Sequence, residues 1–337
     1  MLSDPVIPEH SMHWPTIVLE VVGGLVLFLF GVLQLARSIE PLASDRARQL
    51  IDRFTTNRFA GVVTGAVATT VLDSSSVTII LVIALVNGGL LTFTQSLGVI
   101  MGSNIGTTVS SQIFALDVEA YSPLILLVGF LLFVTAGRSE GRRHVGLAVL
   151  GLGLVFFGLH YMGEAVVPLR DNAQFMRWMT GLERPLLGLA VGAIATVVIQ
   201  SSSAMLGIVI TLASQGLVTL PAGLALMLGA EIGTCADTLV AAIGRTRAAL
   251  RAGIFHLAFN ISSAAVGLLF IDQLAALATS LPGGHSLPRQ IANAHVAFNV
   301  LGVAAFIGFT PLIARILESL VPEAPHEAPA VSGKGGD

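Results

Sequence analysis

Long apolar stretches alternate with short polar segments along the whole chain. A transmembrane helix needs about 20 predominantly apolar residues to cross about 30 Å of hydrocarbon. Stretches close to that length occur at 17–37, 95–115, 121–136, 145–165, 222–243, 251–271 and 290–313. The pattern therefore predicts an all-α polytopic membrane protein with about seven full spans.

Two further apolar regions, 59–90 and 186–220, are each interrupted near the middle by polar residues. The interruptions are Asp73-Ser74-Ser75-Ser76 and Gln200-Ser201-Ser202-Ser203. Irregular backbone cannot face lipid, so each break must be buried in protein or line a polar cavity. We predict that both regions are re-entrant helical hairpins with serine-rich tips.

These two regions belong to an internal repeat. Shifting the chain by 127 residues aligns 61–115 with 188–242 without a gap, and 21 of the 55 positions are identical. The polar and glycine positions keep their register, which apolar helical sequence alone would not require. Each half is therefore predicted to contain a span, a re-entrant hairpin and a following Gly-interrupted span.

An odd number of spans separates the start of one repeat from the start of the next, so the second copy is expected to be inverted. Inverted repeats around a midplane site are common in secondary transporters. The predicted parts are an external N-terminal segment at 1–16, a first repeat with its linking span at 17–143, a second repeat with two C-terminal spans at 144–320, and a disordered cytoplasmic tail at 321–337.

The basic residues provide an independent test of this layout. One side of the membrane would carry the loops at 37–58, 137–144 and 244–251 and the C-terminal tail, with 13 of the 17 Lys and Arg residues. The positive-inside rule places that side in the cytoplasm and the N-terminus outside. Contacts with anionic lipids are an alternative use of the basic loops.

Composition agrees with a membrane protein and excludes other classes. Hydrophobic residues make up 54% of the chain and charged residues 11%, which differs from soluble domains, where about 25% of residues are charged. The net charge of −3 gives no support to nucleic-acid binding. The single Cys235 excludes a disulfide framework within the chain.

The serine triplets and the glycine motifs carry the candidate chemistry. Serine hydroxyls can donate to an anion or offer lone pairs to Na⁺, and a helix that resumes after them exposes unpaired N–H groups. The segments 102–108 and 229–234 place polar residues between paired glycines, which permit local unwinding. Close helix packing by small residues is the alternative explanation, and recurrence of both motifs in both halves weighs against it.

These motifs resemble the type II sodium/phosphate cotransporters and their bacterial relatives. That family carries Gln-Ser-Ser-Ser in each half, followed by Gly-Ala-Asn-Ile-Gly-Thr. The second half here keeps the first motif at 200–203, and the first half keeps the second at 102–107 with Ser103 in place of Ala. A His-x-x-Phe-Asn element occurs at 256–260 and again at 295–299. The resemblance covers about 17–315 and lacks the PhoU-like extension of some relatives.

The resemblance implies a sodium-coupled inorganic phosphate symporter that works by alternating access, with Na⁺ as coupling ion and no cofactor or enzymatic activity. Phosphate, Na⁺ and the lipid bilayer are the expected partners, and the oligomeric state stays open. The expected substrate-binding residues are Ser74, Ser75, Ser76, Asn104, Thr107, Gln200, Ser201, Ser202, Ser203 and Thr234. The expected sodium-binding residues are Asp73, Ser75, Gln200, Ser202, Glu231 and Thr234.

Two carboxylates depart from the family pattern. Asp73 replaces the Gln of the first hairpin, and Glu231 replaces the Asn of the second half, with Asp237 nearby. Carboxylates inside a membrane are costly and usually functional. Either Na⁺ or a proton must compensate their charge, or the substrate is a different small anion. A helix cap is the alternative role for Asp73.

Each histidine of the repeated element precedes an asparagine by four residues, so His256 and Asn260, like His295 and Asn299, share a helix face. An interhelical hydrogen-bonded pair in the bundle core is favoured over ion binding, and metal binding is not expected. An intramembrane serine hydrolase is a different class of function, but a catalytic dyad has no reason to be duplicated. A channel or scaffold is a further alternative.

Overall fold

The computed structural model describes residues 13–116 and 118–323, except for the side chains of 42–44 and 52. The first twelve residues of the predicted external segment and positions 324–337 of the predicted tail lie outside this range. Every regular element within it is helical. The helices are α1 (Trp14–Phe54), α2 (Arg58–Leu72), α3 (Ser75–Asn87), α4 (Phe93–Phe114), α5 (Ser122–Val134), α6 (Glu140–Val166), α7 (Ala173–Gly181), α8 (Pro185–Ile199), α9 (Ser202–Ser214), α10 (Leu220–Gly233), α11 (Cys235–Ala242), α12 (Arg247–Leu269), α13 (Ile271–Ser280), α14 (Leu287–Phe306) and α15 (Thr310–Leu320), with 3₁₀ turns η1 (Glu119–Tyr121), η2 (Val167–Asp171) and η3 (Ile307–Phe309).

Helices that are long and apolar enough to cross a membrane confirm the fold class. Five such segments lie among the described residues, at Trp14–Pro41, Glu140–Asp171, Leu220–Ala242, Arg247–Leu269 and Leu287–Leu320. The other two predicted spans, 95–115 and 121–136, form α4 and α5, which meet at a bend. Two bent pairs, one of them α4 with η1 and α5, raise the number of candidate spans to as many as seven. The protein is an all-α, multi-pass integral membrane protein.

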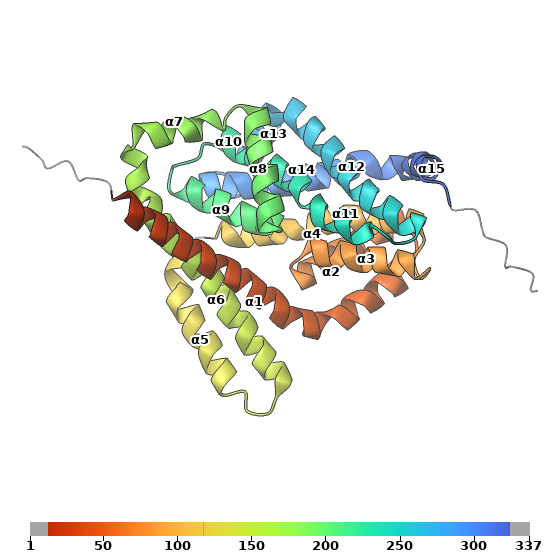
Figure 1. The fold of residues 1–337 in the computed structure, drawn as a ribbon, viewed down its shortest axis with the longest axis horizontal. Coiled ribbons are helices and arrows are strands. Elements are labelled where there is room, and N and C mark those ends of the chain that lie inside the picture. The colour runs from red at the N-terminus through yellow and green to blue at the C-terminus, as the bar shows by residue number, and fades with distance from the viewer. Residues whose placement is uncertain (1–12, 117, 324–337) are drawn as a thin grey trace, which may run out of the picture.

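The helices form a body and a projecting arm (Figure 1). Helix α1 runs along one side of the body and packs against α6, while α5 and α6 form a hairpin that extends away from it. Only Ser122 and Gly129 are buried on α5, and large side chains such as Leu124, Leu127 and Phe130 are exposed. We interpret this apolar surface as lipid-facing, because a soluble protein does not expose such a continuous patch.

The two predicted hairpins are helix–break–helix units with the same geometry. Asp73 (φ 52°, ψ 30°) is the C-cap that follows α2, and Gln200 (φ 60°, ψ 27°) is the C-cap that follows α8. A left-handed conformation is uncommon for residues other than glycine, and it turns the chain sharply at both tips. The positions of the breaks are therefore as predicted, while the re-entrant course and the inverted orientation stay predictions.

The spans that follow the hairpins differ in continuity between the two halves, but their glycines make the same close contact. Helix α4 runs without a break through Gly102, contrary to the expected unwinding, whereas α10 and α11 are separated at Thr234. A Cβ atom at Gly102 would collide with the carbonyl oxygen of Val62, and one at Gly229 with that of Leu189. Glycine at these positions lets the span contact the backbone of its own hairpin, as in other small-residue membrane interfaces.

Helices of the two halves pack against each other in the centre of the body. Helix α4 of the first half contacts α9, α12 and α14, and α3 contacts α11 of the second half. One apolar core lies around α6, α9, α10 and α14, and another around α2–α4, α12 and α15. A row of buried polar side chains on α4, α10, α12 and α14 lies in this central region. The candidate site is built on that row and on the two tips.

Candidate functional site

A serine caps the second helix of each hairpin. The Ser74 hydroxyl accepts a hydrogen bond from the N–H of Val77 at 3.2 Å, and Ser201 accepts one from Ala204 at 3.1 Å. The alternative that Asp73 caps the second helix of the hairpin is therefore wrong: Asp73 is the C-cap of α2, and Ser74 is the N-cap of α3. The caps leave the N–H groups and the positive dipole ends of α3 and α9 at the two tips.

The first tip contacts the spans of both halves. The Ser110 hydroxyl of α4 donates to Asp73 Oδ1, and the Ser76 hydroxyl hydrogen-bonds the Asp237 side chain of α11. The repeat offset makes Ser110 and Asp237 equivalent positions. Asp73, a predicted sodium ligand, is thus bonded to one span, and Ser76, a predicted substrate ligand, is bonded to another.

The remaining tip residues differ in exposure. Ser75 and Ser202, in the first turns of α3 and α9, are buried, whereas Ser203 is half-buried and Gln200 is exposed. The predicted substrate and sodium ligands therefore include both interior and accessible groups. Their assignment to phosphate and Na⁺ stays a prediction.

The predicted ligands on the spans lie deeper. Asn104 is 2% exposed, and its Nδ2 donates to Asn260 Oδ1 at 2.7 Å. Thr107 donates to the carbonyl of Asn104 at 2.7 Å, and Thr234 is buried at the break between α10 and α11. In this conformation Asn104 joins α4 to α12, whereas the Thr107 bond lies within α4, and the role of both residues as substrate ligands stays a prediction.

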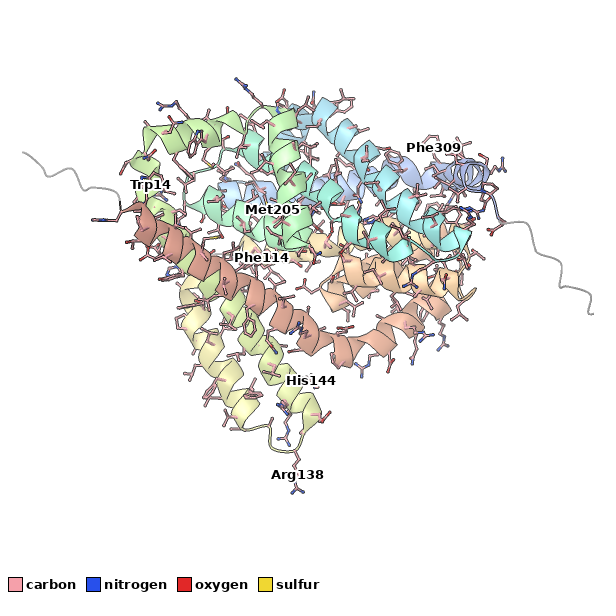
Figure 2. The ribbon with its side chains drawn as sticks, in the orientation of Figure 1. Trp14, Phe114, Arg138, His144, Met205 and Phe309 are labelled. Carbon is pink, nitrogen blue, oxygen red and sulfur yellow. The ribbon has the colours of Figure 1, made fainter. Side chains whose placement is uncertain are left out.

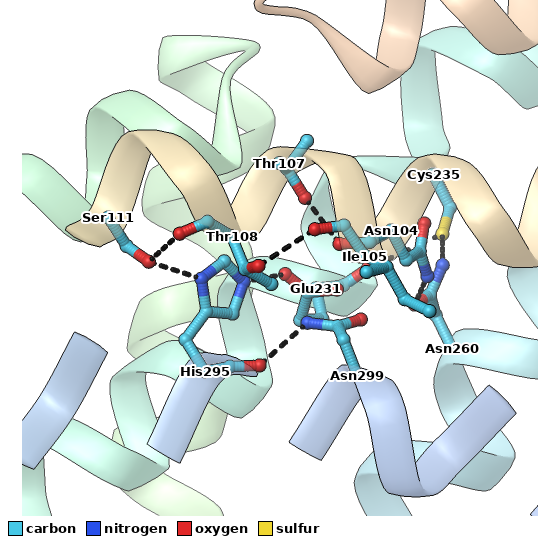
Figure 3. Close-up of polar contacts among 10 residues, drawn as sticks. All are labelled: Asn104, Ile105, Thr107, Thr108, Ser111, Glu231, Cys235, Asn260, His295 and Asn299. Carbon is cyan, nitrogen blue, oxygen red and sulfur yellow. Dashed lines mark hydrogen bonds and ion pairs between the residues drawn. The ribbon is translucent and has the colours of Figure 1, made fainter. Parts of the chain in front are cut away.

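Glu231 faces a histidine in the centre of the molecule (Figure 3). Its Oε1 lies 2.8 Å from His295 Nε2, and the His295 Nδ1 lies 2.9 Å from Ser111 Oγ. Ser111 donates to the Thr108 carbonyl at 2.8 Å, and Asn299 donates to the His295 carbonyl at 3.1 Å. This contact joins α4, α10 and α14, and it gives Glu231 a partner within the protein.

His256 occupies a related position on α12. Its Nδ1 lies 2.8 Å from Thr238 Oγ1, Thr238 donates to the Cys235 carbonyl at 3.0 Å, and His256 Nε2 is buried without a hydrogen-bond partner. Both histidines are 0% exposed and contact neighbouring helices. His256, His295 and Asn260 hydrogen-bond neighbouring helices in the bundle core, as predicted, whereas Asn299 donates to the His295 carbonyl of its own helix.

Ser111, His295 and Glu231 are the residue types of a hydrolytic triad, but the arrangement does not suit a nucleophile. Ser111 is 0% exposed, and its hydroxyl proton is donated to the Thr108 carbonyl. A catalytic serine must reach substrate and pass its proton to the base. The contact therefore binds helices together and does not activate a serine.

Sequence reasoning missed Ser110, Ser111 and Thr238, although a signal was present. The repeat offset pairs Ser110 with Asp237 and Ser111 with Thr238, so polar residues recur at both positions in both halves. The identity of the residues differs, which hid the match from a search for identical motifs.

Comparison with known proteins decides the family. The model of the Na⁺/Pi-cotransporter family matches residues 27–164 and 171–306. The chain belongs to this family. It is therefore a transporter and not an enzyme.

Individual relatives share a modest fraction of identical residues with this chain. The uncharacterized protein YqeW of Bacillus subtilis is 27% identical over 88% of this chain and 96% of its own length. The putative inorganic phosphate export protein YjbB of Salmonella typhimurium is 25% identical over 91% of this chain, which spans 56% of that protein. The human sodium-dependent phosphate transport protein 2B is 33% identical over 29% of this chain. No solved structure matches the chain.

Proposed function

We propose that the protein is a sodium-coupled symporter of inorganic phosphate that works by alternating access. The observation that carries this proposal is the duplicated tip, in which Asp73 and Gln200 share one backbone conformation and Ser74 and Ser201 make the same cap. Two helix N-termini with adjacent hydroxyls suit a small oxyanion, because both supply N–H or O–H donors. Membership of the Na⁺/Pi-cotransporter family supports phosphate as that anion.

Na⁺ is proposed to bind at the same tips. Asp73 offers a carboxylate, while Ser75, Ser202, Gln200 and Thr234 offer neutral oxygens. Na⁺ at Asp73 would lower the repulsion between this carboxylate and an arriving phosphate. The family and the name of the human relative support sodium as the coupling ion.

A second coupling ion is favoured by a specific contact. Glu231, for which the sequence left Na⁺ and a proton open, faces His295 and has no need of a metal ion as counter-charge. We therefore leave Glu231 out of the proposed sodium ligands. Coupling to protons in addition to Na⁺ is the alternative that this contact supports.

Radiolabelled phosphate uptake into proteoliposomes tests the proposal. We expect concentrative uptake with an inward Na⁺ gradient and none when K⁺ replaces Na⁺. Excess sulfate should not compete, whereas competition would indicate a different anion. Because YjbB relatives are named for export, vesicles preloaded with phosphate should be assayed for efflux under an outward Na⁺ gradient. Phosphate movement independent of Na⁺ in both directions would contradict the proposed coupling.

The protein is proposed to lie in a bacterial inner membrane, with its N-terminus outside the cell membrane and its C-terminus in the cytoplasm. The side with most of the basic residues would then be cytoplasmic. Reporter fusions before Met1 and after Asp337 should fall on opposite sides of the membrane. Both reporters on one side would contradict the inverted-repeat arrangement.

A further inference from the structure

Ser111 sets the direction of the hydrogen bonds around His295. Its hydroxyl has one proton, which it donates to the Thr108 carbonyl at 2.8 Å. Ser111 Oγ can then only accept from His295 Nδ1, 2.9 Å away. The network thus assigns the proton of a neutral imidazole to Nδ1, so that Nε2 turns a lone pair toward Glu231.

A proton must lie between His295 and Glu231. A ring nitrogen without a proton and an ionised carboxylate are both acceptors, and their lone pairs would repel at the observed Nε2–Oε1 distance of 2.8 Å. While Ser111 donates to the Thr108 carbonyl, two states satisfy the contact, an imidazolium with a carboxylate or a neutral imidazole with a carboxylic acid. Each contains one proton more than the separated neutral imidazole and carboxylate, and each leaves the pair with no net charge.

The pair lies where the two halves meet. Ser111 belongs to α4 of the first half, Glu231 to α10 of the second half, and His295 to α14, which packs against both helices (Figure 3). Glu231 is 1% exposed and His295 0%, so water has no access to replace the shared proton in this conformation. A movement of α10 relative to α4 and α14 would separate these groups and open the pair.

We infer that Glu231 and His295 form a proton-binding site whose proton is bound and released once per transport cycle, so that phosphate movement is coupled to a proton. The inference rests on the proposed phosphate transport. With the proton bound, the contact holds the halves together. Without it, a carboxylate faces a lone pair and the contact is unstable, so protonation and conformation are linked.

His256 provides an internal comparison. Thr238 donates to the Cys235 carbonyl, so His256 Nδ1 is also the donor and Nε2 also carries a lone pair. The position equivalent to Glu231 in the first half is Asn104, which is an amide and bonds Asn260. No described carboxylate hydrogen-bonds His256, and its environment creates no requirement for a second proton.

The other ionisable side chains on the elements around the pair have their own environments. Arg251 of α12 pairs with Glu323, Arg289 of α14 donates to Gln112, and Asp237 of α11 bonds Ser76. Helices α4, α8 and α9 carry no ionisable residue. The remaining ionisable residues on α11, α12 and α13 are Cys235, Arg247, His256 and Asp272. Cys235 Sγ donates to the backbone carbonyl of Glu231 at 3.5 Å. None of these groups makes a hydrogen bond or ion pair with the side chain of Glu231 or His295 in the described part of the chain.

Counting protons per phosphate tests the inference. Proteoliposomes that enclose a pH-sensitive dye, with the membrane voltage clamped, report proton movement alongside radiolabelled phosphate in the same vesicles. We expect Glu231→Gln to move one proton fewer per phosphate than the parent. Protons carried by phosphate itself cancel in this difference, because both proteins transport the same substrate at the same pH.

Asp272→Asn is the matched control, since it removes an exposed carboxylate of α13 and should keep the parent ratio. If Glu231→Gln does not fold, Glu231→Asn provides the same test, because asparagine already occupies the equivalent position 104. An unchanged ratio in either folded variant, with Na⁺-driven phosphate transport intact, overturns the proton site alone. Failure of the parent to transport phosphate overturns the proposed function and the proton site together.

Discussion

The two halves of the protein share a backbone pattern but place their carboxylates differently. In the first half the tip residue Asp73 is acidic and its span partner Ser110 is neutral. In the second half the tip residue Gln200 is neutral, and the position equivalent to Ser110 is Asp237. The same exchange occurs deeper, where Asn104 of the first half corresponds to Glu231 of the second.

This comparison separates the features of the repeat that are required for folding from those that are available for ion binding. Turn conformation, serine cap and glycine contacts are the same in both halves, so they are requirements of the fold. The charges are not symmetric. A duplicated site with unequal charges can bind different ions at its two sides, which is what coupling an anion to a cation requires. Substitutions at matched positions should therefore have matched effects on folding and unmatched effects on transport.

The largest effect is expected from the glycines that contact the hairpin backbone. Gly102→Leu and Gly229→Leu would each place a side chain against a carbonyl of the same half, Val62 or Leu189. Overpacking of this kind costs about 1–3 kcal/mol or more, and here the backbone itself must move. We expect both variants to lose most of the folded protein, measured as the monodisperse fraction in detergent. Gly141→Leu is a control at a glycine with open space around it. Full recovery of either variant would show that the close contact is dispensable.

Asp73→Asn is expected to have the next largest effect. The amide retains the left-handed conformation, which Asn adopts readily, but it cannot supply a full negative charge to Na⁺. We expect about a tenfold increase in the Na⁺ concentration for half-maximal uptake, which corresponds to about 1.4 kcal/mol, with little change in stability. Gln200→Asn is the matched control without a charge change. If uptake depends on Na⁺ concentration in the same way in the parent and in Asp73→Asn, at two pH values, Asp73 does not bind Na⁺. Cation binding would then be assigned to Gln200 and the serines.

The serines should separate into two classes that are the same in both halves. Ser74→Ala and Ser201→Ala remove helix caps and should lower thermal stability by about 1 kcal/mol each. Ser75→Ala and Ser202→Ala remove buried hydroxyls outside the caps and should weaken phosphate or Na⁺ binding by about 1–3 kcal/mol. Thermal unfolding and binding isotherms on purified variants distinguish the classes. Parent-like binding by both Ser75→Ala and Ser202→Ala would make these serines packing residues.

The smallest effect on ion coupling is expected at His256. His256→Gln removes a buried hydrogen bond to Thr238 and should lower stability by about 1–3 kcal/mol. It should leave the number of protons per phosphate at the parent value, whereas His295→Gln should lower it by one. The same dye assay measures both variants. A change in the proton count at His256 would mean that both histidines carry protons during transport.

Much of the fold followed from local sequence features. The apolar stretches predicted the spans, because the backbone of such a stretch in a bilayer must satisfy its own hydrogen bonds and therefore forms a helix. The breaks at Asp73 and Gln200 were predicted because each is followed by three serines within an apolar region. Such a polar interruption indicates a break in the helix that does not face lipid. The expected unwinding at Gly102 was wrong, because glycine also permits close helix packing and sequence does not show which use applies.

The site was predicted less completely. Residue types at the tips were recognised, but the partners of Asp73 and Glu231 were not. His295 contacts Glu231 across 64 positions and Ser111 across 184 positions of the chain. No periodicity within one helix carries information about such contacts, since they depend on how α4, α10 and α14 pack.

The sequence by itself determined that this is a duplicated, all-helical membrane protein with two serine-rich breaks and three unusual acidic residues in or near its motifs. These properties are local or repeat at a fixed offset, and the membrane makes their consequences strict. Only the tertiary structure decided that Asp73 meets Ser110 on α4, that Asp237 meets Ser76, and that Glu231 meets His295. The reason is physical: a buried charge takes whichever partner the packed helices place beside it, and that choice is made between elements distant in sequence.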